Sequence, residues 1–206
     1  MIVSALHKFI FVAIPKTGTH SVRQALRAHL GPQDLEQVGL FVQKKFPIPE
    51  LARLQHGHLS LAQVQPYLRS EEFAEFFKFA FVRNPFDRFV SYCAFMTRQS
   101  GEFDRDAKAV MQHFIASPPW PHILFQPQHS FVTSSEGEML ADDVGRVEEM
   151  QASYDRIAQR IGIPTATLDK VNSSDRKDYR DYYDQSLIDG VAKLYARDLE
   201  LFGYEF

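Results

Sequence analysis

Lysine, glycine and hydroxyl side chains come together in the stretch AIPKTGTHS, residues 13–21. Lys16 can reach an anionic oxygen, and Gly18 lets the backbone approach a ligand closely. Hydroxyl groups follow around the predicted first turn of a helix, on Thr17, Thr19 and Ser21. This combination predicts a loop that holds a phosphate-like anion.

The order of residues in this loop differs from that of a loop for a nucleoside triphosphate. A Walker A loop reads G-x-x-x-x-G-K-S/T, with the lysine after the second glycine. Here position 13 is alanine, and Lys16 precedes Gly18. In addition, no aspartate at the end of a predicted strand stands out as a magnesium ligand. The loop is therefore expected to work without magnesium.

A second group of polar residues lies in FVRNPFDRFVSY, residues 81–92. Arg83 follows a predicted strand, and Ser91 falls on the same helix face as Asp87 and Arg88. The planar guanidinium of arginine suits a terminal phosphate monoester, so Arg83 and Ser91 are candidates to bind a second phosphate. The alternative is an arginine that only pairs with Asp87, an interpretation that fits Arg88 better than Arg83. Together the loops predict a ligand with two separate phosphate groups.

Both loops are expected to follow a buried strand and to open a helix. KFIFVAI (8–14) and KFAFV (78–82) are continuous apolar runs, typical of central strands. Helical spacing then begins at Thr19, and again at Asp87, a plausible N-cap. Helix N-termini at the carboxyl ends of strands attract anions. The fold expected is α/β, with a mainly parallel sheet flanked by helices around a P-loop-like nucleotide-binding core.

The rest of the chain shows no internal repeat and no long linker, so a single domain over 1–206 is expected. Further elements are predicted as a short helix at 71–77, a helix at 104–116, short strands near 130–133 and 143–148, a helix after 148 with Gly162 as C-cap, and a last helix at 184–202.

The two loops resemble motifs of sulfotransferases that use 3′-phosphoadenosine 5′-phosphosulfate (PAPS). PKTGTHS is similar to their 5′-phosphosulfate loop and VRNPFDRFVSY to their 3′-phosphate motif, particularly in the carbohydrate (family 2) group that includes heparan sulfate 2-O-sulfotransferase. The resemblance implies PAPS as co-substrate and no metal. It implies that the 3′-phosphate is bound by Arg83 and Ser91. It assigns the 5′ end to Lys16, Thr17, Gly18, Thr19, Ser21 and the intervening His20, which stands where a threonine or serine is usual.

Two histidines surround Gly57 in LQHGHLSL, residues 54–61. An imidazole is suited to take a proton from a hydroxyl group at neutral pH. The H-G-H element resembles the catalytic stretch of the 2-O-sulfotransferases, which implies that one histidine is the general base. We favour His58, with His56 as its orienter or alternate. The alternatives are a surface pair without a role and a zinc site, for which two histidines lack the further ligands.

The composition bounds the class of protein. With 206 residues and 45% hydrophobic content the chain can bury the core of one domain. The net charge of −3 gives no general polyanion-binding signature, so a nucleic-acid partner is not expected. The single cysteine, Cys93, is typical of a reducing compartment. A bacterial-type cytoplasmic enzyme is expected, without signal peptide or membrane anchor, and with a small-molecule or glycan acceptor.

The predicted reaction is sulfuryl transfer, in which a hydroxyl deprotonated by His58 attacks sulfur in line while Lys16 neutralises the leaving phosphate. One alternative is a divergent P-loop kinase or NTPase, which would need magnesium and ATP. Another is an inactive nucleotide-binding module. A charged stretch could close over the nucleotide as a lid, or remain a solvated loop, through Lys170, Ser173, Ser174 and Arg176.

Overall fold

The computed structural model describes residues 1–39, 44–168 and 177–206. These described residues fall into two compact units. The first unit is Met1–Val82 with the described part of Ser130–Val171, and the second is Arg83–His129 with the described part of Asn172–Phe206. Lys170, Ser173, Ser174 and Arg176 lie outside the described residues, so the lid stays a prediction. The single domain over 1–206 also stays a prediction.

Among the described residues, the first unit contains a five-stranded sheet in the order β3-β1-β2-β4-β5. Its strands are β1 (Ile2–Ser4), β2 (Phe9–Val12), β3 (Leu35–Glu36), β4 (Phe77–Val82) and β5 (Asp143–Arg146). β2, β4 and β5 are parallel, whereas β1 runs antiparallel to both β2 and β3. The predicted α/β fold is therefore confirmed, with a parallel centre and an antiparallel edge.

The two apolar runs form the middle of this sheet. β2 lies between β1 and β4, and β4 lies between β2 and β5. Every residue of β2 is buried, as is β4 from its second residue onward. Because both faces of these strands are covered, their sequences lack polar alternation. The predictions for 8–14 and 78–82 are confirmed over Phe9–Val12 and Phe77–Val82.

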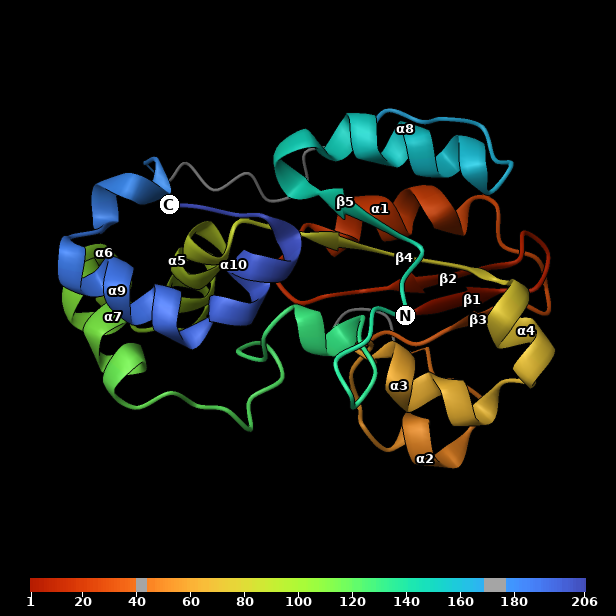
Figure 1. The fold of residues 1–206 in the computed structure, drawn as a ribbon, viewed down its shortest axis with the longest axis horizontal. Helices are drawn as coiled ribbons and strands as arrows, with labels where there is room; N and C mark the ends of the chain where they lie inside the picture. The colour runs from red at the N-terminus through yellow and green to blue at the C-terminus, as the bar shows by residue number, and fades with distance from the viewer. Residues whose placement is uncertain (40–43, 169–176) are drawn as a thin grey trace. The chain divides into compact units, whose positions relative to one another are not determined.

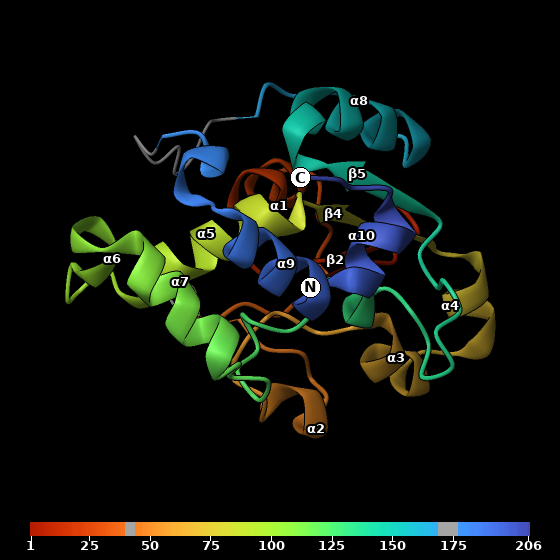
Figure 2. The same ribbon diagram turned by 60° about the vertical axis from the view of Figure 1, so that its left-hand side comes forward.

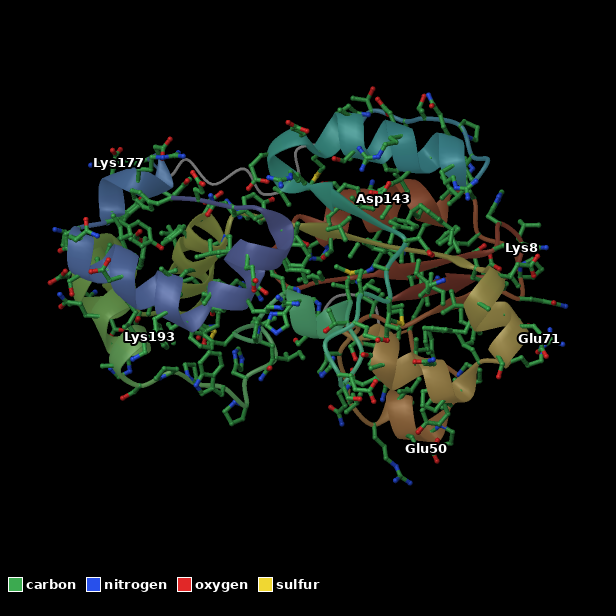
Figure 3. The ribbon with its side chains drawn as sticks, in the orientation of Figure 1. Lys8, Glu50, Glu71, Asp143, Lys177 and Lys193 are labelled. Carbon is green, nitrogen blue, oxygen red and sulfur yellow. The ribbon has the colours of Figure 1, made fainter. Side chains whose placement is uncertain are left out.

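Helices cover both faces of the sheet in the first unit. They are α1 (Thr19–Arg27), α2 (Pro49–Ala52), α3 (Leu61–Val64), α4 (Ser70–Glu75) and α8 (Met150–Arg160), with 3-10 turns η1 (Gln65–Tyr67) and η3 (Val147–Glu149). α1 and α8 lie on one side of the sheet, and α2 and α3 on the other (Figures 1 and 2). Lys8 and Glu71 mark the end of the sheet where β2 begins and α4 lies (Figure 3). The phosphate-loop candidate therefore leaves β2 at the opposite end.

The second unit is helical. It comprises α5 (Pro85–Met96), α6 (Glu102–Arg105), α7 (Ala107–Ala116), α9 (Gln185–Leu194) and α10 (Ala196–Phe202), with the 3-10 turn η4 (Tyr179–Tyr182). α5, α7 and α9 contact one another around an aromatic core. Its buried members include Phe89, Tyr92, Phe125 and Tyr195. No helix in the part of the chain that the structure describes is long and apolar enough to cross a membrane.

Several predicted boundaries are wrong, each for a local reason. The helix at 104–116 is interrupted at Asp106, which leaves helical geometry and caps α7 by accepting from the Ala109 amide. The helix at 184–202 is interrupted at Tyr195, with φ of −119° and ψ of 28°. The stretch near 130–133 forms η2 (His129–Phe131) and an isolated bridge instead of a strand. Gly162 is not the C-cap of α8, because Ile161 holds that position and Gly162 follows it. The strand predicted near 143–148 is confirmed over Asp143–Arg146 as β5.

Candidate active site

The first loop, which joins β2 to α1, makes its turn with left-handed backbone geometry. Lys16 and Gly18 both have a φ of 66°. This conformation is uncommon for a lysine, and such strain is concentrated at functional sites. Thr17 is fully buried, and its hydroxyl donates to the Ile14 carbonyl at 3.0 Å, which stabilises the turn. The loop thus has a defined conformation that holds Lys16 two residues before the N-cap of α1.

Gly18 is the N-cap residue of α1. Because glycine has no side chain, the first-turn amides receive no bond from the cap residue, and the positive end of the helix dipole favours an anion here. A Cβ atom at Gly18 would collide with the terminal methyl group of Met150 at the start of α8. Thr19 and Ser21 are buried in the first turn. The position therefore requires glycine for its backbone conformation and for its close contact.

His20 lies in the same first turn and is exposed. Partial burial and the charges of Arg23, Arg27 and Lys16 lower the pKa of His20. Burial makes the largest contribution to this shift, and the three nearby positive charges place the start of α1 in a positive field. An anion bound at this helix end would be stabilised by the same field.

His58 is joined to the first loop by a hydrogen bond. Its Nδ1 lies 2.7 Å from the carbonyl oxygen of Ala13, the residue directly after β2. A carbonyl only accepts, so Nδ1 carries the hydrogen and Nε2 keeps its lone pair. Burial lowers the pKa of His58 to about 3, so the ring is neutral at pH 7. His58 therefore presents an unprotonated nitrogen at neutral pH, and the same burial makes it a weaker base than a solvated imidazole.

The H-G-H element is fixed from both sides. A Cβ atom at Gly57 would collide with the backbone carbonyl of Gln37, so only glycine fits between the histidines. After His58 the chain enters α3 through a capping box, in which Ser60 Oγ accepts from the Gln63 amide and Gln63 Oε1 accepts from the Ser60 amide. These contacts hold the backbone of His58 in one place.

His56 lies beside His58, with ring centroids 6.1 Å apart. Desolvation lowers the pKa of His56 as well. Its Nδ1 is buried and has no hydrogen-bond partner among the described residues. The structure thus brings the two histidines together, and the bond to Ala13 distinguishes His58 from its neighbour.

A buried carboxylate that the sequence analysis missed lies beneath α1. Glu36 of β3 accepts from Arg27 at 2.8 Å and pairs with Lys44 at 3.2 Å and with Arg23 at 3.7 Å. Burial lowers the pKa of Arg23 to about 10, so it remains charged at neutral pH. Its charge also contributes to the low pKa of His58. The signal in the sequence was the spacing of Arg23 and Arg27, which places both on one face of a helix.

In the second unit, Arg83 rather than Arg88 pairs with Asp87. Arg83 Nε donates to Asp87 Oδ2 at 2.6 Å. Arg88 is buried and donates through Nη2 to the carbonyls of Leu124 and Gln126. The expected Asp87–Arg88 pair is wrong because Asp87 and Arg88 are consecutive helix residues whose side chains point in different directions.

α5 begins one turn earlier than predicted. Asn84 is its N-cap, and Asn84 Oδ1 accepts from the Phe86 amide at 3.0 Å. Asp87 therefore lies inside the first turn, and its prediction as N-cap is wrong. Ser91 is buried on α5, one turn beyond Asp87. Within the second unit, Arg83, Asp87 and Ser91 thus follow one another at four-residue spacing.

The parallel strands, the glycine-capped helix and the oriented histidine define an α/β protein with a phosphate-loop-like site. The model of the sulfotransferase family matches residues 1–205, and the chain belongs to the sulfotransferase family. The predicted resemblance is therefore confirmed at the family level. Members of this family transfer sulfuryl groups, generally from PAPS, and the chain is a transferase of that type. No curated protein and no solved structure matches the chain.

Proposed function

We propose that this protein transfers the sulfuryl group of PAPS to a hydroxyl group of a carbohydrate or glycolipid acceptor, with His58 as general base. The observation that carries the proposal is the hydrogen bond from His58 Nδ1 to the Ala13 carbonyl, which leaves Nε2 as a proton acceptor beside the first loop. A base fixed in this way needs no reorganisation when the acceptor hydroxyl arrives.

In the proposed reaction the acceptor oxygen forms a bond to sulfur while the bond between sulfur and the bridging phosphate oxygen breaks. The hydroxyl proton moves to His58 Nε2, and 3′-phosphoadenosine 5′-phosphate leaves. Lys16 and the first-turn amides of α1 would neutralise the charge that develops on the leaving oxygen. The left-handed backbone at Lys16 and the glycine N-cap support this role.

The remaining nucleotide contacts are assigned residue by residue. Thr17, Gly18, Thr19, His20 and Ser21 would surround the 5′ end. Arg83 and Ser91 would bind the 3′-phosphate, which a planar guanidinium matches with paired hydrogen bonds. The ion pair to Asp87 supports this assignment because it orients the Arg83 side chain and uses only the Nε donor.

The acceptor and the compartment are proposed from composition. The net charge of −3 gives no broad basic surface for a long polyanion, which favours a small glycan, a glycolipid or a metabolite. The lone Cys93 is buried, and burial raises the pKa of its thiol, so it is an unreactive side chain. This cysteine content supports the proposed cytoplasmic location.

Substitution of His58 tests the proposal. Asparagine at this position keeps a donor for the Ala13 carbonyl but has no basic nitrogen. We expect His58→Asn to lower kcat by about 10²–10⁴-fold, the usual contribution of a general base. Its affinity for 3′-phosphoadenosine 5′-phosphate should stay within about twofold of the wild type, since the variant retains the loop contact. Turnover is followed as nucleotide release from PAPS with a panel of glycans and glycolipids.

The matched control is His56→Asn, which changes the neighbouring ring without touching the bond to Ala13. We expect its kcat to fall less than that of His58→Asn. A His58→Asn variant that keeps the wild-type kcat would contradict the role of His58. If His56→Asn alone abolished turnover, His56 would be the base.

A further inference from the structure

The backbone amide and carbonyl of Arg83 lie outside both the strand β4 and the helix α5. β4 ends at Val82, which is paired with Arg146 in the last register position of the sheet. Asn84 is already the N-cap of α5. Arg83 therefore lies between the strand and the N-cap of the helix, and its amide and carbonyl need partners from elsewhere.

One side chain, that of Gln128, supplies both partners. The Arg83 amide donates to Gln128 Oε1 at 2.9 Å, and Gln128 Nε2 donates to the Arg83 carbonyl at 2.9 Å. Gln128 is fully buried, so these bonds are shielded from competing water. A glutamine amide has one acceptor and one donor side at the spacing of a peptide group. It thus satisfies both backbone groups of Arg83.

Gln128 is anchored in turn by a buried carboxylate of α10. Asp198 is fully buried, and its Oδ2 accepts from the Gln128 amide at 2.7 Å. Its Oδ1 accepts from the His129 amide at 2.8 Å and lies 2.7 Å from His129 Nδ1. A carboxylate that accepts several charge-assisted bonds fixes the segment strongly. The contacts run from Asp198 through Gln128 to the backbone of Arg83.

We infer that Gln128, anchored by Asp198, is a positioning residue that holds Arg83 for recognition of the 3′-phosphate. The inference rests on the proposed function. Gln128 fixes the backbone of Arg83, while Asp87 fixes the direction of its guanidinium at Nε. A phosphate-binding fork that is already oriented loses less conformational entropy on binding. Loss of Gln128 should therefore weaken recognition of the 3′-phosphate selectively.

Calorimetric titration of the full chain tests this with two nucleotides that differ only in the 3′-phosphate. The probes are 3′-phosphoadenosine 5′-phosphate and adenosine 5′-phosphate. We expect Gln128→Leu to weaken binding of the first by about tenfold, and binding of the second by less than about twofold. Arg83→Ala should give a similar selective loss. In the Arg83→Ala background, Gln128→Leu should add less than about twofold, because it acts through Arg83.

The matched control is Gln126→Leu, which removes the same type of side chain two residues earlier. The side-chain Nε2 of Gln126 donates to the Trp120 carbonyl and makes no bond to Arg83 among the described residues. We expect it to leave both affinities unchanged. Should Gln128→Leu fail to fold, Gln128→Asn keeps a neutral side-chain amide on a shorter side chain, and we expect it to show a smaller but still selective loss.

Any of three results would overturn the inference alone. One is an equal loss for both nucleotides, which indicates a merely structural role, and another is a full additional loss in the Arg83→Ala background. A selectivity that depends on Arg83 and not on Gln128 would have the same meaning. By contrast, a wild-type protein that shows no preference for the 3′-phosphate would overturn the proposed 3′-phosphate site itself.

Discussion

The two loops that follow β2 and β4 are held in their conformations in different ways. In the first loop, the conformation is set by the backbone. Lys16 and Gly18 have left-handed φ angles, and Gly18 is the N-cap of α1. In the second loop, the conformation is set by side-chain hydrogen bonds. Asn84 caps α5, and Gln128 and Asp87 bond to Arg83. The first loop offers a helix N-terminus to an anion, whereas the second offers an oriented guanidinium.

This difference matches the two tasks of the proposed reaction. At the 5′ end charge develops during transfer, and amides with a helix dipole stabilise such charge without moving. The 3′-phosphate does not react, so its site has only to recognise it. A planar arginine fork provides that discrimination. The comparison therefore predicts that damage to the first loop lowers kcat, while damage to the second weakens nucleotide selectivity.

The largest expected effect is that of Lys16→Ala. Removal of one group that stabilises the leaving oxygen should cost about 10²–10³-fold in kcat, or about 2.7–4 kcal/mol, in a protein that remains folded. The variant is assayed by nucleotide release from PAPS, with circular dichroism to verify the fold.

Lys8→Ala is the matched control for this substitution. Lys8 also has a positive φ, of 51°, but pairs with Glu75 at 2.5 Å near α4 (Figure 3). Loss of Lys8 should leave kcat within about twofold of the wild type, because an exposed ion pair of this kind contributes little. Near-normal turnover of Lys16→Ala would show that Lys16 does not stabilise the leaving oxygen.

A smaller effect is expected from Gly18→Ala, which we compare with Gly162→Ala. Both glycines are left-handed, with φ of 66° and 71°, and an added Cβ meets nothing within 4 Å at Gly162. Each substitution should lower the free energy of unfolding by about 1–2 kcal/mol through backbone strain, and Gly18→Ala adds the cost of moving the terminal methyl group of Met150. Only Gly18→Ala should also weaken binding of 3′-phosphoadenosine 5′-phosphate. Equal binding losses in the two variants would show that the glycine cap is not part of the anion site.

The smallest effect concerns pH and the bond from His58 to the first loop. The pKa of His58 is lowered to about 3, whereas the unfolded chain has an ordinary value near 6.5. Between these pH values the unfolded state binds a proton that the folded state does not. The stabilisation that comes from the neutral His58 ring is therefore fully present above pH 6.5 and is lost as the pH falls toward 3. From pH 7 to 5.5 this group should remove about 1 kcal/mol.

Urea unfolding at both pH values measures this loss. His58→Asn has no such proton to bind, so its stability should fall by about 1 kcal/mol less than that of the wild type over the same interval. An equal loss in both proteins would show that the imidazole is not held neutral in the fold.

The central strands and the turn after β2 could be predicted because their signals are local, and the roles assigned to the loop residues stay predictions. Continuous apolar runs predicted β2 and β4, and each was confirmed as a central strand. The pattern of β1 was missed because its three residues are too few to show a period. The interruptions at Asp106 and Tyr195 were missed because a helix break depends on local capping and packing, which apolar spacing does not report.

Long-range contacts of the site could not be predicted. The bond between His58 and Ala13 joins residues 45 positions apart, and the contact of Gln128 with Arg83 spans the same separation. Glu36 and Asp198 show no motif in the sequence, and their roles follow only from burial with several donors around them. Sequence motifs predicted the groups proposed to face a ligand, whereas the residues that contact those groups became visible only in the fold.

The most direct test of the central claim is calorimetric titration of the protein with 3′-phosphoadenosine 5′-phosphate, in parallel with ATP and magnesium. A sulfotransferase with the two phosphate sites proposed here should bind the bisphosphate tightly without any added metal and bind ATP–magnesium much more weakly. Tight, magnesium-dependent binding of ATP together with no measurable binding of 3′-phosphoadenosine 5′-phosphate would contradict the proposed donor and indicate a P-loop kinase or NTPase.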